Sequence, residues 1–178
     1  MFTAGDKVEA RTLSTIAGSQ VSVPAPDRLV HLQFRRFAGC PICNLHLQEV
    51  ARRCDEIEGA GVTEVILFHS SADRLREFVA NVPFAMVADP ERKLYREFGV
   101  ESSLRSLLYA DAARAAVRGI RRSASLSGAL APTENHLGKP ADFLIEPDGT
   151  IRACKYGVHA DDQWSVDELL RLAAEDDD

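Results

Sequence analysis

The feature that most constrains the fold is an alternation of short apolar runs with amphipathic stretches. Residues 28–34 alternate apolar and polar side chains, while residues 62–68 and 84–88 are largely apolar. The first pattern predicts a strand with two unlike faces, and the other two predict buried strands. Helix-like segments separate these runs, and residues 142–157 predict a hairpin around Pro147, Asp148 and Gly149. This order predicts an α/β fold, with one sheet and helices on both of its faces.

The remaining segments fit the same plan. Residues 4–24 predict an N-terminal hairpin, and an apolar stripe predicts one helix from Pro41 to about residue 59. Further helices are expected over 72–82, over 91–98 with Asp89 as N-cap, over 103–120, and over 166–175 behind a Ser165–Glu168 capping box. The stripe of the first helix consists of Cys43, Leu47, Val50, Cys54 and Ile57.

Composition narrows the class of protein. A net charge of −6 argues against a nucleic-acid-binding surface, and no stretch approaches the roughly 20 apolar residues that span a bilayer. The N-terminus has no apolar core of a secretory signal, so we expect a cytoplasmic protein, a single domain over 1–178 with an insertion at about 101–138. Cytoplasmic thiols are normally reduced, so a close cysteine pair there is catalytic or metal-binding rather than a structural disulfide.

Such a pair lies in "FAGCPICN", residues 37–44. Cys40 is expected at the helix N-cap with Pro41 as the first helical residue, where free N–H groups and the helix dipole stabilise a thiolate. Cys43 lies one turn deeper and should be better protected than Cys40. This asymmetry favours Cys40 as the attacking thiolate and Cys43 as its resolving partner.

Other interpretations of these residues stay open. The pair could be two small buried residues, or half of a zinc site, although the sequence has no second pair to complete four ligands. Cys54 and Cys154 are expected to be packing residues. His46 is either a proton relay or a boundary histidine. The cluster of His159, Asp161, Asp162 and Trp164 is either a capping loop or a surface for a partner or a metal.

Three segments carry a resemblance to a known family: "GCPIC" at 39–43, "FAMVADPERKLYREFGV" at 84–100 and "GKPADFLIEPDGTI" at 138–151. In this order they resemble the peroxiredoxin-like AhpC/TSA family of the thioredoxin-fold superfamily, over residues 4–172. The resemblance implies a thioredoxin-like fold with a central mixed sheet, an N-terminal hairpin and a helical insertion before the C-terminal β-hairpin.

The chain also departs from that family. Peroxiredoxins carry P-x-x-x-T-x-x-C at the peroxide-attacking cysteine, and neither Cys40 nor Cys43 preserves this motif. The arginine that opens the family's R-x-x-F is Pro140 here. Dithiol reductases of the thioredoxin type carry a proline at that place, usually cis, beside the CxxC. Pro140, Lys139 and Pro41 are therefore expected to contact substrate, with Lys139 a candidate replacement for the missing arginine.

Together these features predict a thiol-dependent antioxidant enzyme that cycles Cys40–Cys43 and needs no cofactor or metal. Its substrate would be a peroxide or a protein disulfide, and its reductant a thioredoxin-like protein or a low-molecular-weight thiol. The alternative is a non-enzymatic redox sensor or adaptor on the same scaffold. The basic insertion at 101–138 could cover the site, bind an anionic substrate or form a homodimer contact.

Overall fold

A computed structural model describes residues 1–78, 82–100 and 139–175. The strands are β1 (Arg11–Ser14), β2 (Gln20–Val23), β3 (Leu29–Arg35), β4 (Val62–Phe68), β5 (Ala85–Ala88), β6 (Ala141–Ile145) and β7 (Ile151–Tyr156). The helices are α1 (Pro41–Arg52), α2 (Cys54–Gly59), α3 (Ala72–Phe78), α4 (Lys93–Glu97) and α6 (Val166–Ala174). The helix expected over 103–120 and the loop after it lie outside the described residues. No described helix is long and apolar enough to cross a bilayer.

One mixed sheet organises the molecule, and its strand order is β5-β4-β3-β6-β7. β3, β4 and β5 run parallel to one another, whereas β6 is antiparallel to both β3 and β7. The separate hairpin β1–β2 confirms the one expected near the N-terminus. The predicted α/β class and mixed central sheet are therefore confirmed.

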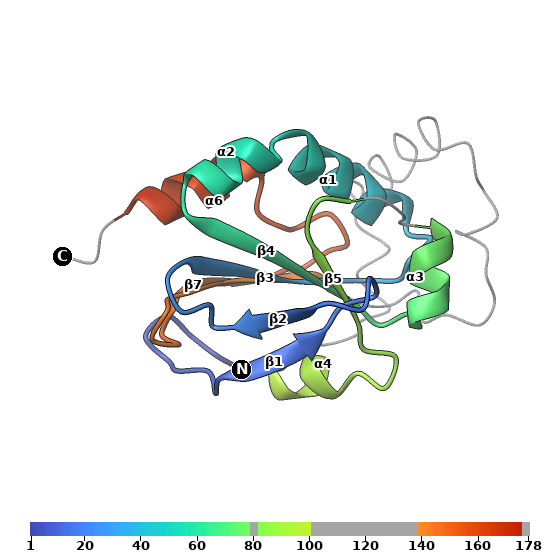
Figure 1. The fold of residues 1–178 in the computed structure, drawn as a ribbon, viewed down its shortest axis with the longest axis horizontal. Coiled ribbons are helices and arrows are strands. Elements are labelled where there is room, and N and C mark those ends of the chain that lie inside the picture. Colours follow the sequence, from blue (N-terminus) through green and yellow to red (C-terminus); the bar gives the residue numbers. More distant parts are fainter. Residues whose placement is uncertain (79–81, 101–138, 176–178) are drawn as a thin grey trace.

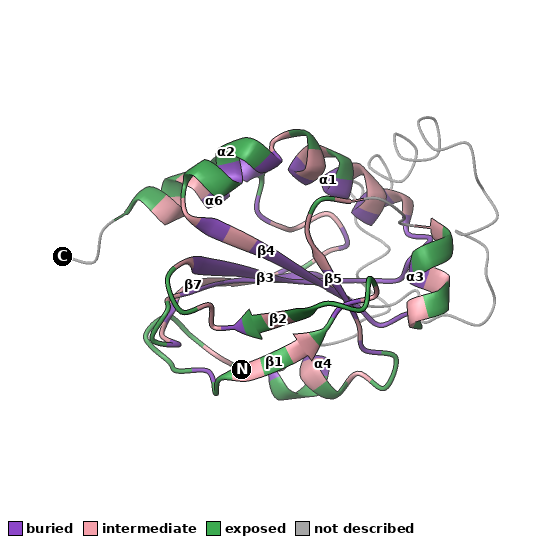
Figure 2. Ribbon diagram, viewed as in Figure 1, coloured by how far each residue is buried: buried purple, intermediate pink, exposed green. Residues whose placement is uncertain are grey.

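Helices cover both faces of this sheet. Helices α1, α2 and α6 lie on one side, and α4 lies on the other with the β1–β2 hairpin (Figure 1). Figure 2 shows that the central strands are buried along their length, while these helices are exposed on their outer surfaces. The side with α4 encloses an aromatic core, in which Phe34 packs against Tyr95, Phe98 and Phe143 at centroid distances of 5.0–5.7 Å.

Two helices differ from the prediction. The single helix expected from Pro41 is broken at Arg53, whose ψ of 20° separates α1 from α2, although every residue of the predicted stripe is buried. α4 begins at Lys93 rather than 91, because Arg92 adopts a left-handed conformation (φ 57°). Asp89 still caps this helix from outside, since its carboxylate accepts hydrogen bonds from the N–H groups of Lys93 and Leu94 at 2.9 and 2.8 Å.

Candidate functional site

Cys40 lies where the sequence predicts, at the N-cap of α1. Its backbone is extended (φ −68°, ψ 114°), and Pro41 occupies the first turn. The Cys40 sulfur accepts a hydrogen bond from the backbone N–H of Cys43 at 3.4 Å. One of the unpaired N–H groups of the helix start is thus aimed at the sulfur, which favours its anionic form.

Both cysteines are buried free thiols, with exposed fractions of 0% for Cys40 and 2% for Cys43. The expectation that Cys40 is the more accessible of the two is wrong in this conformation. The two residues belong to an apolar cluster that includes Phe37, Ile42 and Ala160. Any reagent that reaches Cys40 therefore has to displace part of this cluster.

The pKa values of the two thiols move in opposite directions. Burial by itself would raise the pKa of Cys40, but a hydrogen bond from the Cys43 thiol and the charge of Arg36 outweigh it and lower the pKa to about 7. Burial raises the pKa of Cys43 well above its usual range, and its hydrogen bond to Cys40 adds to that effect. Near pH 7 the pair is therefore poised to hold one negative charge, on Cys40.

Arg36 supplies the cation beside that sulfur. Its Nη1 lies 3.7 Å from the Cys40 Sγ, and its guanidinium carbon lies 5.3 Å from the centre of the Phe37 ring. The side chain is itself buried, so little water screens its charge. The sequence places Arg36 only near the site, as one of two adjacent arginines. Its contact with sulfur becomes visible only in the folded chain.

Three hydrogen bonds hold the backbone of the loop between β3 and α1. The Ala38 N–H donates to the Ser70 hydroxyl at 2.9 Å, and the His69 N–H donates to the Arg36 carbonyl at 3.3 Å. From the other side of the sheet, the Tyr95 hydroxyl donates to the Arg35 carbonyl. Sequence reasoning missed Ser70 and Tyr95 as supports of the site, because they belong to different elements that only the fold brings together.

A buried polar network lies next to the site, on the face of β3 that α1 covers. The Asp142 Oδ1 accepts from the Arg35 Nη2 at 2.6 Å and lies 3.2 Å from the His31 Nε2. His31 Nδ1 lies 3.0 Å from a Glu64 oxygen, and Gln33 bonds to Glu64 and Arg35. Burial would lower the pKa of His31, but the charge of Glu64 and the hydrogen bonds to Asp142 and Glu64 raise it to about 9.

His46 is not a proton relay in this structure. It is buried, and its Nε2 accepts from the Arg35 Nη2 at 3.1 Å. Burial lowers the pKa of His46 well below its usual range, and the charge of Arg35 lowers it further. A proton on this nitrogen would face a guanidinium, so His46 acts as a neutral hydrogen-bond acceptor that ties α1 to the sheet.

Pro140 is not the cis proline that the resemblance to dithiol reductases implies. Among the described peptide bonds, only the one before Pro24 is cis, so Pro140 is trans. Its carbonyl accepts the Gly157 N–H at 2.9 Å. Both residues line a cavity of about 220 Å³ with Tyr156 and Val158, and no contact described for the structure joins either one to a cysteine sulfur.

Polar residues of the loop after β7 form hydrogen bonds within the loop and an ion pair with β7. The Asp162 carboxylate accepts the Val158 N–H at 2.8 Å and pairs with Lys155 at 2.8 Å, and the Asp161 N–H donates to the His159 ring at 3.3 Å. No group of metal-binding side chains is found within the described residues. These bonds fit the interpretation of a capping loop.

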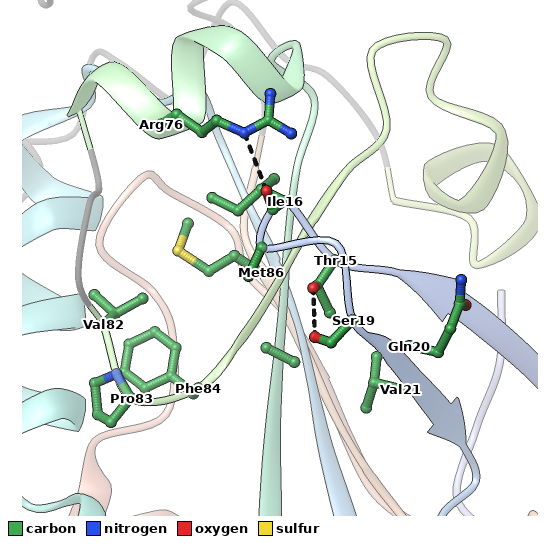
Figure 3. Close-up of a pocket in the computed structure, with 12 residues that line it drawn as sticks. Thr15, Ile16, Ser19, Gln20, Val21, Arg76, Val82, Pro83, Phe84 and Met86 are labelled. Carbon is green, nitrogen blue, oxygen red and sulfur yellow. Dashed lines mark hydrogen bonds between the residues drawn. The ribbon is translucent and has the colours of Figure 1, made fainter.

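A larger cavity of about 640 Å³ lies between the β1–β2 turn and β5 (Figure 3). Phe84 and Met86 line it from β5 and the preceding loop, and Ile16 lines it from the hairpin. The Ile16 N–H donates to the Met86 carbonyl at 2.9 Å, so the hairpin turn is joined to the edge of the sheet here. Neither Cys40 nor Cys43 lines this cavity.

Solved structures with the same fold include several redox proteins. Peroxidoxin BcpB from Mycobacterium tuberculosis aligns with a TM-score of 0.69 at 17% identity, covering 97% of both chains. A putative thiol:disulfide interchange protein DsbE from Chlorobium tepidum aligns with a TM-score of 0.63 at 18% identity, covering 98% of this chain and 100% of the other. A cysteine-to-serine mutant of Peroxiredoxin 6 of Arenicola marina gives 0.71 at 16% identity over 97% of this chain and 72% of the other.

At these identities the structural likeness establishes the thioredoxin-like fold, and no curated protein matches the sequence. The family model named AhpC/TSA matches residues 4–154, which include β1 through the first part of β7 and both Cys40 and Cys43. The fold, the position of the cysteine pair and this match agree with the resemblance found in the sequence. The chain belongs to the AhpC/TSA family.

Proposed function

We propose that this protein is a thiol-dependent redox enzyme that reduces small hydroperoxides by cycling Cys40 and Cys43 between dithiol and disulfide. The observation that carries the proposal is the asymmetry of the pair: the pKa of Cys40 is lowered to about 7 beside Arg36, and that of Cys43 is raised. A thiolate at neutral pH is what nucleophilic attack on a peroxide requires.

The reaction balances in two steps. The Cys40 thiolate attacks one peroxide oxygen, so that an S–O bond forms and the O–O bond breaks. The departing alkoxide takes a proton from water and leaves as an alcohol, and Cys40 becomes a sulfenic acid. The Cys43 sulfur then attacks Cys40, the S–S bond forms, and the hydroxyl leaves as water with the Cys43 proton. An external dithiol or low-molecular-weight thiol returns the pair to the reduced state.

Two observations favour a peroxide over a protein disulfide as substrate. Cys40 is 0% exposed, so a protein-sized reactant needs a larger rearrangement than a molecule of a few atoms. The cis proline that thioredoxin-type dithiol reductases carry beside the CxxC is absent at Pro140, which is trans. Protein-disulfide reduction therefore remains the second candidate, supported by the CxxC spacing.

Stopped-flow mixing of the reduced protein with hydrogen peroxide tests the proposal. We expect second-order thiol loss at least about tenfold faster than for free cysteine at pH 7, because far more of Cys40 is thiolate than of a thiol with a pKa of about 8.5. Cys40→Ser should abolish the fast phase, whereas Cys43→Ser should keep it and accumulate a sulfenic acid. A rate equal to that of free cysteine would contradict peroxide reduction. Peroxide consumption that stops after one turnover, even with a dithiol present, would favour the alternative of a non-enzymatic redox sensor.

A further inference from the structure

Arg36, the residue that follows β3, contacts both cysteines of the pair. Its guanidinium Nη1 lies 3.7 Å from the Cys40 Sγ, and its backbone N–H donates a hydrogen bond to the Cys43 sulfur. Its carbonyl accepts the His69 N–H at 3.3 Å, which holds the same residue from the end of β4. Arg36 is 4% exposed, so one buried residue presents a cation to one sulfur and an amide to the other.

The two sulfurs also act on each other. Burial raises the pKa of Cys43, and the hydrogen bond that the Cys43 thiol donates to Cys40 raises it further, as does the negative charge on Cys40. The charge of Arg36 and the hydrogen bond from its N–H lower the pKa of Cys43. In the reduced protein the first set of effects is the larger one, so Cys43 keeps its proton while Cys40 is the thiolate.

Oxidation of Cys40 changes this balance. In a sulfenic acid or a mixed disulfide the Cys40 sulfur carries no negative charge, so the two effects of the thiolate on Cys43 are lost. The guanidinium and the N–H of Arg36 stay in place, and little water screens them at this buried position. The cation that favours an anion on Cys40 before oxidation therefore favours one on Cys43 afterwards.

We propose that Arg36 is a catalytic residue for both steps of the cycle, and that it stabilises first the Cys40 thiolate and then the Cys43 thiolate that closes the disulfide. In the second step the Cys43 thiol gives its proton to water, and its thiolate attacks the Cys40 sulfur. The S–S bond forms, and hydroxide leaves Cys40, takes up a proton and becomes water. This inference rests on the proposed function, which it deepens by assigning Arg36 to disulfide closure.

The test separates the two steps with a small reagent that takes the place of the peroxide. Equimolar methyl methanethiosulfonate converts the Cys40 thiolate to a methyl disulfide and releases methanesulfinate. The Cys43 thiolate then attacks Cys40, and methanethiolate leaves and is protonated to methanethiol. Samples of the reduced, full-length protein are quenched at successive times and mapped by peptide mass. The formation and the decay of the methyl disulfide at Cys40 thus give one rate for each step.

Arg36→Gln removes the charge and keeps the backbone N–H, whereas Arg36→Lys keeps a charge. The matched control is Arg74→Gln, because both arginines stack on a neighbouring ring: Arg74 lies 4.8 Å from the centre of Phe78, and Arg36 lies 5.3 Å from that of Phe37. The control should change neither rate, and Arg36→Lys should lie closer to the wild type than Arg36→Gln does.

An opposite charge at this range lowers a pKa by about 1–3 units, so we expect the pH midpoint of methyl disulfide decay to rise by about that amount in Arg36→Gln. At pH 7 the decay should slow by about threefold to thirtyfold, because the thiolate fraction falls about tenfold per unit while the more basic thiolate regains about threefold in nucleophilicity. Above both midpoints the variant should be no slower than the wild type, whereas misplaced sulfurs would react slowly at every pH.

An unchanged midpoint for the decay in Arg36→Gln, or equal slowing at every pH, would overturn the role of Arg36 in closure. Circular dichroism checks folding, and Arg36→Met, whose apolar side chain suits a buried position, decides if Arg36→Gln does not fold. The proposed peroxide reduction is judged separately, by the hydrogen peroxide rate of the wild type. A raised midpoint in the variant with no fast peroxide reaction in the wild type would retain the role of Arg36 and reject the peroxidase.

Discussion

The two faces of β3 show two different ways of burying a strand. One face carries Val30, Leu32 and Phe34, and the other carries His31, Gln33 and Arg35. Each of these side chains is at most 2% exposed. The apolar face packs by shape against the aromatic core, whereas the polar face is buried only because each charge has a partner on a neighbouring strand or on α1. Helix α1, which follows Cys40, contacts the polar face through the hydrogen bond between His46 and Arg35.

Removing one charge from the polar face should cause the largest loss in the free energy of unfolding. Asp142→Ala leaves Arg35 and His31 without their shared carboxylate and removes the acceptor of the Trp164 N–H. Breaking a buried charge pair costs about 3–5 kcal/mol, so we expect a loss of that size in the free energy of unfolding in urea.

Replacing both partners of the Arg35–Asp142 ion pair tests whether the two charges depend on each other. Arg35→Met combined with Asp142→Leu removes both charges, and we expect it to destabilise the protein less than Asp142→Ala alone. A double variant that lost as much as the sum of the two single variants would show that the charges do not depend on each other.

The polar face should also respond to pH, unlike the apolar one. The pKa of His31 is raised from 6.5 to about 9 in the folded protein, so its stabilisation is full below pH 6.5 and is lost as the pH rises through about 9. Wild type should therefore exceed His31→Gln by about 2–3 kcal/mol more at pH 6 than at pH 10. Phe34→Leu, on the opposite face, should change stability by the same amount at both values. A pH-independent difference for His31→Gln would show that the imidazole is neutral.

The smallest effect is expected where a polar group enters the apolar face. The Tyr95 hydroxyl donates to the carbonyls of Arg35 and Leu67 from within the aromatic core. Tyr95→Phe keeps the ring and removes these bonds, so unfolding in urea should show a loss of about 0.5–1.5 kcal/mol. A loss above about 3 kcal/mol would mean that this hydroxyl, and not the ring packing, positions α4.

Local patterns were sufficient for much of the fold. The β-branched run at 62–68 matches β4 residue for residue, and Ser165 forms the predicted capping box with Glu168. The predicted start of α4 at residue 91 was wrong because Arg92 adopts a left-handed conformation that no local motif required. The alternation in β3 predicted two unlike faces but gave no information about the carboxylates on β4 and β6 that allow the polar one to be buried.

The site was predictable in position but not in environment. The N-cap place of Cys40 follows from Pro41 and the change of periodicity, both of which are local. Cys40 lies in an apolar cluster that also includes Ala160, and the Pro140 carbonyl accepts a hydrogen bond from Gly157, so both environments involve segments that are distant in the sequence. The sequence placed Arg36 near the pair, whereas its approach to within 3.7 Å of the sulfur is set by the turn that leads into α1.

The pH dependence of Cys40 alkylation, followed by mass mapping, decides whether Cys40 is a thiolate held by Arg36 and the start of α1. We expect an apparent pKa of about 7 for Cys40 in the wild type, and a rise toward the ordinary value of about 8.5 in Arg36→Gln. An apparent pKa near 9 in the wild type, or alkylation of Cys43 at lower pH than Cys40, would contradict this expectation.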